Sequence, residues 1–167
     1  MYQAGFEAEK DLVHPVDLAQ AVAIESGWPF RRDEEDQLLI EYEGNWRIYS
    51  LSVSLLEDME ILLVRAGFSF KLNEDNSAPV LQVVNYANQI CPVGAFTLHC
   101  SEESMVFGTG QTITGEGHLT SQQLTRLIEI CIAQCERFYP AFQAAILGVG
   151  DVQSAIEAAV LEPIGEC

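Results

Sequence analysis

Two cysteines, Cys131 and Cys135, lie four residues apart in a segment with helical periodicity. This spacing places both thiols on one face of a helix, where they could hold a soft metal ion or form a redox pair. It is also typical of two small apolar side chains in a core-facing stripe, and we predict this second role. The five cysteines contain no CxxC pair, and their odd number in a chain expected in the cytoplasm predicts reduced thiols.

The three histidines show no spacing that is typical of a catalytic or metal site. His14, His99 and His118 are not at metal-ligand spacing with another histidine, a cysteine or a carboxylate. His99 and Cys100 are neighbours on a predicted strand, so their side chains point to opposite faces and form no nucleophile pair by themselves. The sequence therefore predicts a protein that is not an enzyme, with no catalytic residue, cofactor or metal.

Two further stretches are candidate ligand sites. The glycine-rich segment Gly108–Gly117 lacks the lysine of a P-loop and does not open directly onto a helix. It supports only an alternative hypothesis, in which the protein is a small-molecule sensor or an unrecognised enzyme. The acidic stretch Arg31–Gln37 lacks the alternating ligands and central glycine of a calcium loop, which favours a solvated loop or edge.

Composition restricts the class of protein and its partners. The chain has 167 residues, of which 49% are hydrophobic, and a formal net charge of −17. These values predict one folded domain from residue 14 to 167, preceded by a loose segment over residues 1–13. The charge disfavours binding to nucleic acid or an anionic membrane and favours a basic partner segment. No signal-peptide pattern or membrane-length apolar run is present, so we expect a cytoplasmic protein.

Periodicity predicts an α+β fold around a mostly antiparallel sheet of five strands. Helices are expected to begin at Pro15, at Thr120 with Gln123 in a capping box, and near Asp151. A further helix is expected to begin near Ser77, capped by Ser77 or by a nearby Asn or Asp, with Pro79 in its first turn. Strands are expected as a meander over Leu38–Glu43, Trp46–Leu55 and Met59–Leu72, with a bulge at Gly67, and as a hairpin around Ser101–Ser104. The order is helix, three-strand meander, helix, hairpin, long helix and short helix.

The long helix is predicted to kink or end near Tyr139. The stretch CERFYPAFQ (Cys135–Gln143) contains Pro140, which cannot donate to the carbonyl of Glu136. The proline would re-aim the chain so that Phe138, Tyr139 and Phe142 clamp the C-terminal segment to the body. The alternative is that these three aromatic side chains line a partner surface.

The stretch from Leu124 to Glu166, which contains FYPAFQ, resembles the C-terminal part of bacterial YbjN-domain proteins in their alphaproteobacterial subgroup. Segments Val84–Gln111 and Arg47–Phe68 resemble the central helix, hairpin and meander of that family. The chain departs from the family pattern at LGVGDVQ (Leu147–Gln153). The resemblance implies a fold similar to that of type III secretion chaperones, often a dimer, and the role of a sensory transduction regulator without known catalytic residues.

We therefore expect a protein-interaction module, chaperone- or adaptor-like, that forms a homodimer. A five-strand sheet offers a second face, and an apolar sheet face is normally buried against something. We predict a partner or dimer surface that includes eight residues: Trp46, Ile48, Tyr49, Leu51, Val53, Phe138, Tyr139 and Phe142. Leu62, Val64 and Phe107 were further candidates for the second sheet face.

Overall fold

The computed structural model describes residues 13–113 and 119–161. The predicted loose segment over residues 1–13 lies outside these ranges apart from Val13. In chain order the elements are α1 (Pro15–Ser26), β1 (Phe30–Glu34), β2 (Gln37–Glu43), β3 (Ile48–Leu56), the 3₁₀ turn η1 (Glu57–Met59), β4 (Ile61–Ser69), α2 (Glu74–Ile90), β5 (Ala95–His99), β6 (Ser104–Thr112), α3 (Ser121–Leu147) and α4 (Val152–Leu161). Among them no helix is long and apolar enough to cross a membrane.

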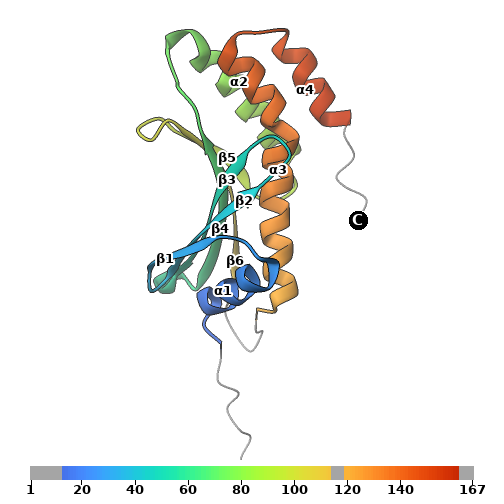
Figure 1. Cartoon of the computed structure of the whole chain (residues 1–167). Coiled ribbons are helices and arrows are strands. Elements are labelled where there is room, and N and C mark those ends of the chain that lie inside the picture. The colour runs from blue at the N-terminus through green and yellow to red at the C-terminus, as the bar shows by residue number, and fades with distance from the viewer. Residues whose placement is uncertain (1–12, 114–118, 162–167) are drawn as a thin grey trace, which may run out of the picture.

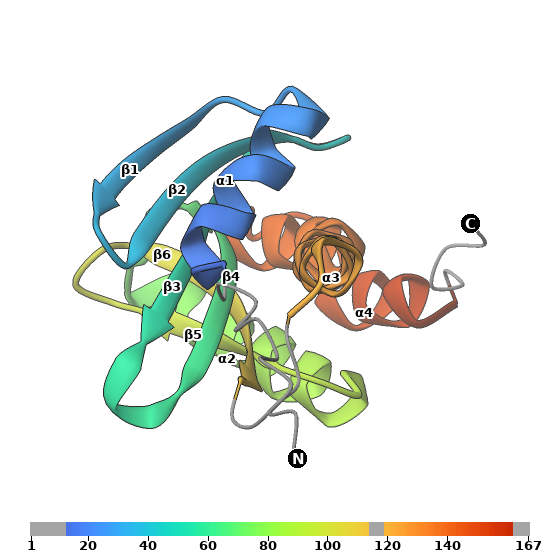
Figure 2. The same cartoon turned by 90° about the horizontal axis from the view of Figure 1, so that it is seen from below.

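The described strands form one antiparallel sheet in the order β1-β2-β3-β4-β6-β5. The helices gather on one side of it, and α3 runs along the sheet as its main cover (Figure 1). Viewed from below, α3 is seen end-on between the sheet and α4 (Figure 2). The predicted α+β class is confirmed. One long amphipathic helix therefore supplies most of the apolar surface that the sheet must bury.

The core follows the alternation of the strands. On β3, Tyr49, Leu51 and Val53 face the helices and are fully buried, whereas Ser50 and Ser52 point to the opposite face. The apolar stripe of α3 meets them with side chains of the same burial, namely Leu124, Ile128, Cys131, Cys135, Phe138 and Phe142. The opposite face of the sheet carries small and polar side chains along its middle strands, among them Ser50, Ser52, Ser54, Gly108 and Gly110.

Most helix starts follow the predicted capping chemistry. Pro15 is the first residue of α1, Thr120 and Gln123 form the capping box of α3, and Gly27 ends α1 in a left-handed conformation. The predicted cap of α2 by an asparagine near Ser77 is confirmed, but the prediction that Pro79 lies in the first turn is wrong. Asn73 and Asn76 form a capping box before the expected position, which places Pro79 in the sixth position of α2. The amide side chains of two asparagines satisfy the free N–H groups there.

Two strand predictions need correction. The sheet has a sixth strand, β1, in the charged stretch that was expected to be an exposed connection or edge, and the edge alternative is the one that the structure shows. It pairs with β2 from Phe30 opposite Ile40 to Glu34 opposite Gln37. Gly67 is not a bulge, because it pairs in register with Ser50 on one side and Val106 on the other. β1 is short and charged because it is an edge strand, where such composition discourages pairing with other chains.

The other edge of the sheet is closed by a side chain from α2. Phe96 in β5 donates its N–H to Asn88 Oδ1 at 2.7 Å, and Asn88 Nδ2 donates to the Phe96 carbonyl at 3.0 Å. The amide of Asn88 thus takes the two hydrogen bonds that an added strand would make at this residue. Asn88 therefore blocks strand addition at Phe96, and the charged side chains of β1 discourage it at the opposite edge.

The predicted end of the long helix near Tyr139 is wrong. α3 continues from Ser121 to Leu147 with Pro140 inside it. Phe138, Ala141 and Phe142 around the proline are fully buried, so packing holds this turn although the Glu136 carbonyl lacks its usual intrahelical donor. The chain reverses later, where Gly148 ends α3 in the left-handed conformation.

Pro140→Ala is expected to raise the free energy of unfolding by about 1–2 kcal/mol. Alanine restores the missing N–H donor and removes the helix-interior penalty of proline, which is larger than the packing lost from one half-buried ring. Urea unfolding followed by circular dichroism measures the change. Gln143→Ala, at an exposed site of the same helix, is the control and should change little. A less stable Pro140→Ala variant would show that the ring packing outweighs the backbone penalty.

Candidate functional site

The connection between β2 and β3 is fastened to α3 by one carboxylate. Glu136 accepts hydrogen bonds from the backbone N–H groups of Asn45, at 3.0 Å, and Trp46, at 3.4 Å. Within the connection, the Gly44 N–H donates to the Arg47 carbonyl at 2.9 Å. The link spans about 90 residues of sequence, so it fixes the loop relative to the helix that covers the sheet.

Gly44 allows this close approach. A Cβ atom at this position would overlap the Glu136 carboxylate and would lie 2.5 Å from Cε2 of the Tyr49 ring. The Tyr49 hydroxyl is buried there, beside the Glu136 carboxylate. Burial raises the pKa of Tyr49, and the adjacent negative charge of Glu136 raises it further, so the hydroxyl stays neutral.

Trp46 is held at the surface by aromatic packing. Its ring stacks on Tyr139 of α3, with centroids 6.2 Å apart and 28° between the planes. The indole nevertheless remains 54% exposed. Arg47 packs against the same aromatic side chains. Its guanidinium lies 5.5 Å from the Phe68 ring centroid and 5.9 Å from that of Tyr139.

A small hollow continues from Tyr139 along the end of α3. It has a volume of about 140 Å³, and Arg47, Phe70, Gln143 and Leu147 are among the residues that line it. We call Trp46, Arg47, Tyr139, Gln143 and Leu147 the Trp46 surface. Leu147 is 62% exposed, so apolar side chains stand at both ends of this surface. An exposed indole beside a hollow is the kind of feature that protein-binding surfaces use.

The structure separates the eight residues of the predicted surface into two groups. Trp46 and Ile48 are exposed and Tyr139 is half-buried. The other five lie in the interior of the fold: Tyr49, Leu51, Val53, Phe138 and Phe142. The prediction that these five residues are accessible is wrong, because α3 covers the sheet face to which Tyr49, Leu51 and Val53 point.

The remaining candidate residues have structural places. Cys131 and Cys135 are buried, as predicted for core residues, with Sγ atoms 3.6 Å from the Val64 carbonyl oxygen and 3.5 Å from that of Ala66. Burial raises the pKa of Cys131 to about 12 and raises that of Cys135 further. Neither thiol is therefore a reactive thiolate near neutral pH.

The glycine-rich segment is not a loop over its described part. Gly108–Thr112 forms the second half of β6, and residues 114–117 of the segment lie outside the described ranges, as does His118. His99 ends β5, and its Nδ1 lies 3.9 Å from Glu102 Oε2. Gly108 lies between β4 and β5 in the sheet, where strand pairing uses the backbone N–H groups that a phosphate-binding loop would leave free.

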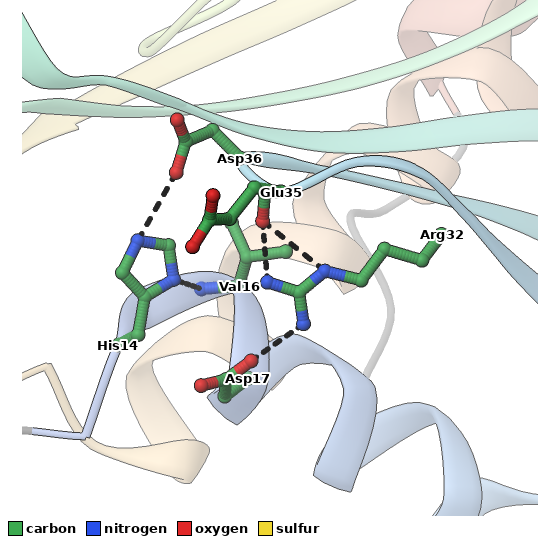
Figure 3. Close-up of polar contacts among 6 residues, drawn as sticks. All are labelled: His14, Val16, Asp17, Arg32, Glu35 and Asp36. Atoms are coloured by element: carbon green, nitrogen blue, oxygen red, sulfur yellow. Dashed lines mark hydrogen bonds and ion pairs between the residues drawn. The ribbon is translucent and has the colours of Figure 1, made fainter.

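One polar cluster had no signal in the sequence. His14 Nε2 lies 3.2 Å from Asp36 Oδ1, and His14 Nδ1 accepts a hydrogen bond from the Val16 N–H at 3.3 Å (Figure 3). Beside it, Arg32 pairs with Asp17 of α1, and the guanidinium holds the pKa of that carboxyl below its usual range. These residues are far apart in sequence, so only the docking of α1 against the β1–β2 turn brings them together.

Comparisons with known proteins agree on the family. The YbjN family model, described as "Putative bacterial sensory transduction regulator", matches residues 15–144. No curated protein matches the chain in a sequence search. A solved structure described as "Crystal structure of YbjN, a putative transcription regulator from E. coli" aligns with a TM-score of 0.58 at 12% identity, covering 80% of this chain and 93% of that one. At this identity the alignment shows a shared fold alone. With its family model matching the sheet, the first two helices and most of α3, the chain belongs to the YbjN family.

Proposed function

We propose that this protein is a non-enzymatic regulator that acts by binding another protein through the Trp46 surface. The family is described as a sensory transduction regulator, which is consistent with this role. The proposal depends on one observation, that a tryptophan is held rigidly by its neighbours and is still half exposed to water.

The rigidity matters because binding then costs little conformational entropy. The loop backbone is held by Glu136, and the indole rests on Tyr139. A side chain that is already in place loses few rotamers when a partner covers it. Tryptophan, tyrosine and arginine are also the residue types that most often dominate binding energy, and all three occur on the Trp46 surface.

The chemistry of the partner follows from charge and from the anchor. A net charge of −17 attracts basic segments over long range and repels acidic ones. The exposed indole and the hollow beside it favour an apolar side chain as the buried contact. We therefore expect a partner segment that is basic and amphipathic, as a chaperone- or adaptor-like protein in the cytoplasm would bind.

The predicted homodimer is the competing occupant of the same surface. Six of the residues expected on an apolar second sheet face are instead buried toward the helices: Tyr49, Leu51, Val53, Leu62, Val64 and Phe107. A dimer would accordingly rely on Trp46 and Ile48, with less apolar area than the sequence suggested. The dimer remains a proposal, and the oligomeric state is measured in the same experiment.

The test compares Trp46→Ala with Leu81→Ala, which removes an exposed apolar side chain on α2. Partners captured from the source cytosol at low salt are purified, and their dissociation constants are measured. Trp46→Ala is expected to weaken binding by about 10–30-fold while Leu81→Ala retains it. Binding should weaken as salt rises.

Sedimentation equilibrium completes the design. A mass of about 37 kDa, twice the chain mass of 18.5 kDa, that falls to a single chain in Trp46→Ala would identify a second copy as the occupant. Equal affinity of the wild type and Trp46→Ala for every purified partner would rule out the Trp46 surface. No partner and a constant single-chain mass would refute the proposed function itself.

A further inference from the structure

Three potential metal-binding side chains converge at the N-terminal end of α1 from three separate segments. His14 precedes α1, Asp36 lies in the turn between β1 and β2, and Glu57 is the first residue of η1. Each offers one ligand atom, and these atoms all lie within 4.8 Å of one another. We propose that His14, Asp36 and Glu57 bind a divalent transition-metal ion.

The donor set fits such an ion, and the His14–Asp36 distance already matches its geometry. One imidazole nitrogen with two carboxylate oxygens suits Zn²⁺, Mn²⁺ or Co²⁺, whereas Ca²⁺ and Mg²⁺ prefer oxygen alone. His14 Nε2 and Asp36 Oδ1 are 3.2 Å apart. Two ligands that are each about 2.0–2.2 Å from one ion are separated by about 3–3.5 Å in tetrahedral or octahedral geometry. Water would complete the coordination, since the His14 and Asp36 side chains are partly exposed.

The negative charge of Asp36 and Glu57 also favours a bound cation. Two carboxylates close to one another repel unless a cation lies between them. Within the described residues, neither Asp36 nor Glu57 forms an ion pair with a lysine or arginine. The nearby Arg32 guanidinium is engaged by Asp17 and by the Glu35 carbonyl (Figure 3). The excess negative charge is thus left for an ion to neutralise.

The backbone around the three ligands is already fixed. The Leu55 N–H donates to the Asp36 carbonyl at 2.9 Å, which ties the β1–β2 turn to the end of β3. The Leu18 N–H donates to the His14 carbonyl at 3.0 Å, and the Glu60 N–H donates to the Glu57 carbonyl at the same distance. Ion binding then requires only side-chain rotation, which lowers its entropic cost.

Metal binding would change the tautomer of His14. Without an ion, Nδ1 accepts from the Val16 N–H, so a neutral ring carries its proton on Nε2 and donates it to Asp36. An ion at Nε2 needs the lone pair there, and the proton then resides on Nδ1. The single 3.3 Å contact to Val16 is exchanged for the metal bond. The ion would join the start of α1 to the β1–β2 turn and η1.

The test uses tag-free, chelator-treated full chain and measures Co²⁺ binding by calorimetry and by its absorption spectrum. We expect one saturable site per chain, a spectrum of nitrogen and oxygen ligands without a thiolate band, and a higher Tm with bound ion. His14→Ser keeps an N-capping side chain and removes the ligand. It should lower the affinity at least about 100-fold, since even outer-shell changes cost 10–100-fold.

Two further variants separate the site from other ligands in the chain. Glu57→Gln removes one carboxylate charge and should also weaken binding strongly, whereas His99→Ser, at a distant imidazole, should leave it unchanged. Absence of saturable binding to the wild type would overturn the proposal. So would an unchanged affinity in both His14→Ser and Glu57→Gln, or a thiolate spectrum, which would assign the ion to the cysteines.

Discussion

Replacing Phe138 with alanine is expected to lower the free energy of unfolding by about 3–5 kcal/mol. The side chain is fully buried in α3, and its ring meets that of Phe96 edge-to-face with centroids 5.7 Å apart. Truncation removes buried apolar area and leaves a cavity between α3 and the sheet, and it also ends the aromatic contact. Urea unfolding followed by tryptophan fluorescence and circular dichroism gives the change.

Leu147→Ala is the matched control, because Leu147 lies in the same helix and is 62% exposed. Its substitution should change the stability by no more than about 0.5 kcal/mol. A similarly small effect of Phe138→Ala would mean that α3 does not cover the sheet in this way. The aromatic residues would then be available to a partner, which was the alternative interpretation of their sequence.

Gly94→Ala is expected to destabilise the protein by about 2–5 kcal/mol for two separate reasons. Gly94 has a φ of 76°, and a residue with a Cβ pays about 1–2 kcal/mol there. The added atom would also lie 2.5 Å from the Gly108 carbonyl oxygen and 2.8 Å from Cζ of Phe107. Such overpacking typically costs about 1–3 kcal/mol. Thermal and urea unfolding measure the sum.

Gly108→Ala tests the same region without the strain. Its φ is not positive, and the nearest atom to its new Cβ would be Arg65 Cγ, at 3.3 Å on a flexible side chain. We expect a change below about 1 kcal/mol. If Gly94→Ala changed the stability as little as this control does, Gly94 would not be packed tightly against Phe107 and Gly108 of β6.

Local chemistry predicted a large part of the fold. In β3, Tyr49, Leu51 and Val53 lie on one face of the sheet and Ser50 and Ser52 on the other, because neighbouring side chains on a strand must point to opposite faces. Alternation alone does not show which of the two faces the helices bury. The surface prediction therefore mixed core residues with exposed ones, and only Trp46, Ile48 and Tyr139 remained accessible.

Other features depend on packing that local patterns do not encode. β1 has no apolar alternation, since an edge strand gains its stability from pairing with β2. Pro140 weakens a helix considered in isolation, but the buried residues on either side of it keep α3 intact. His14, Asp36 and Glu57 are about 20 residues apart in sequence, so no ligand spacing could indicate the cluster.

The position of α3 in the chain has a consequence for synthesis on the ribosome. The strands β1 to β4 are complete by Ser69, whereas the helix that covers their apolar side reaches Phe142 only 73 residues later. At translation rates of 5–20 residues per second this interval lasts about 4–15 s. During that time the nascent sheet has Tyr49, Leu51 and Val53 without their final cover. The half-made chain is therefore the form most in need of protection by ribosome-associated chaperones.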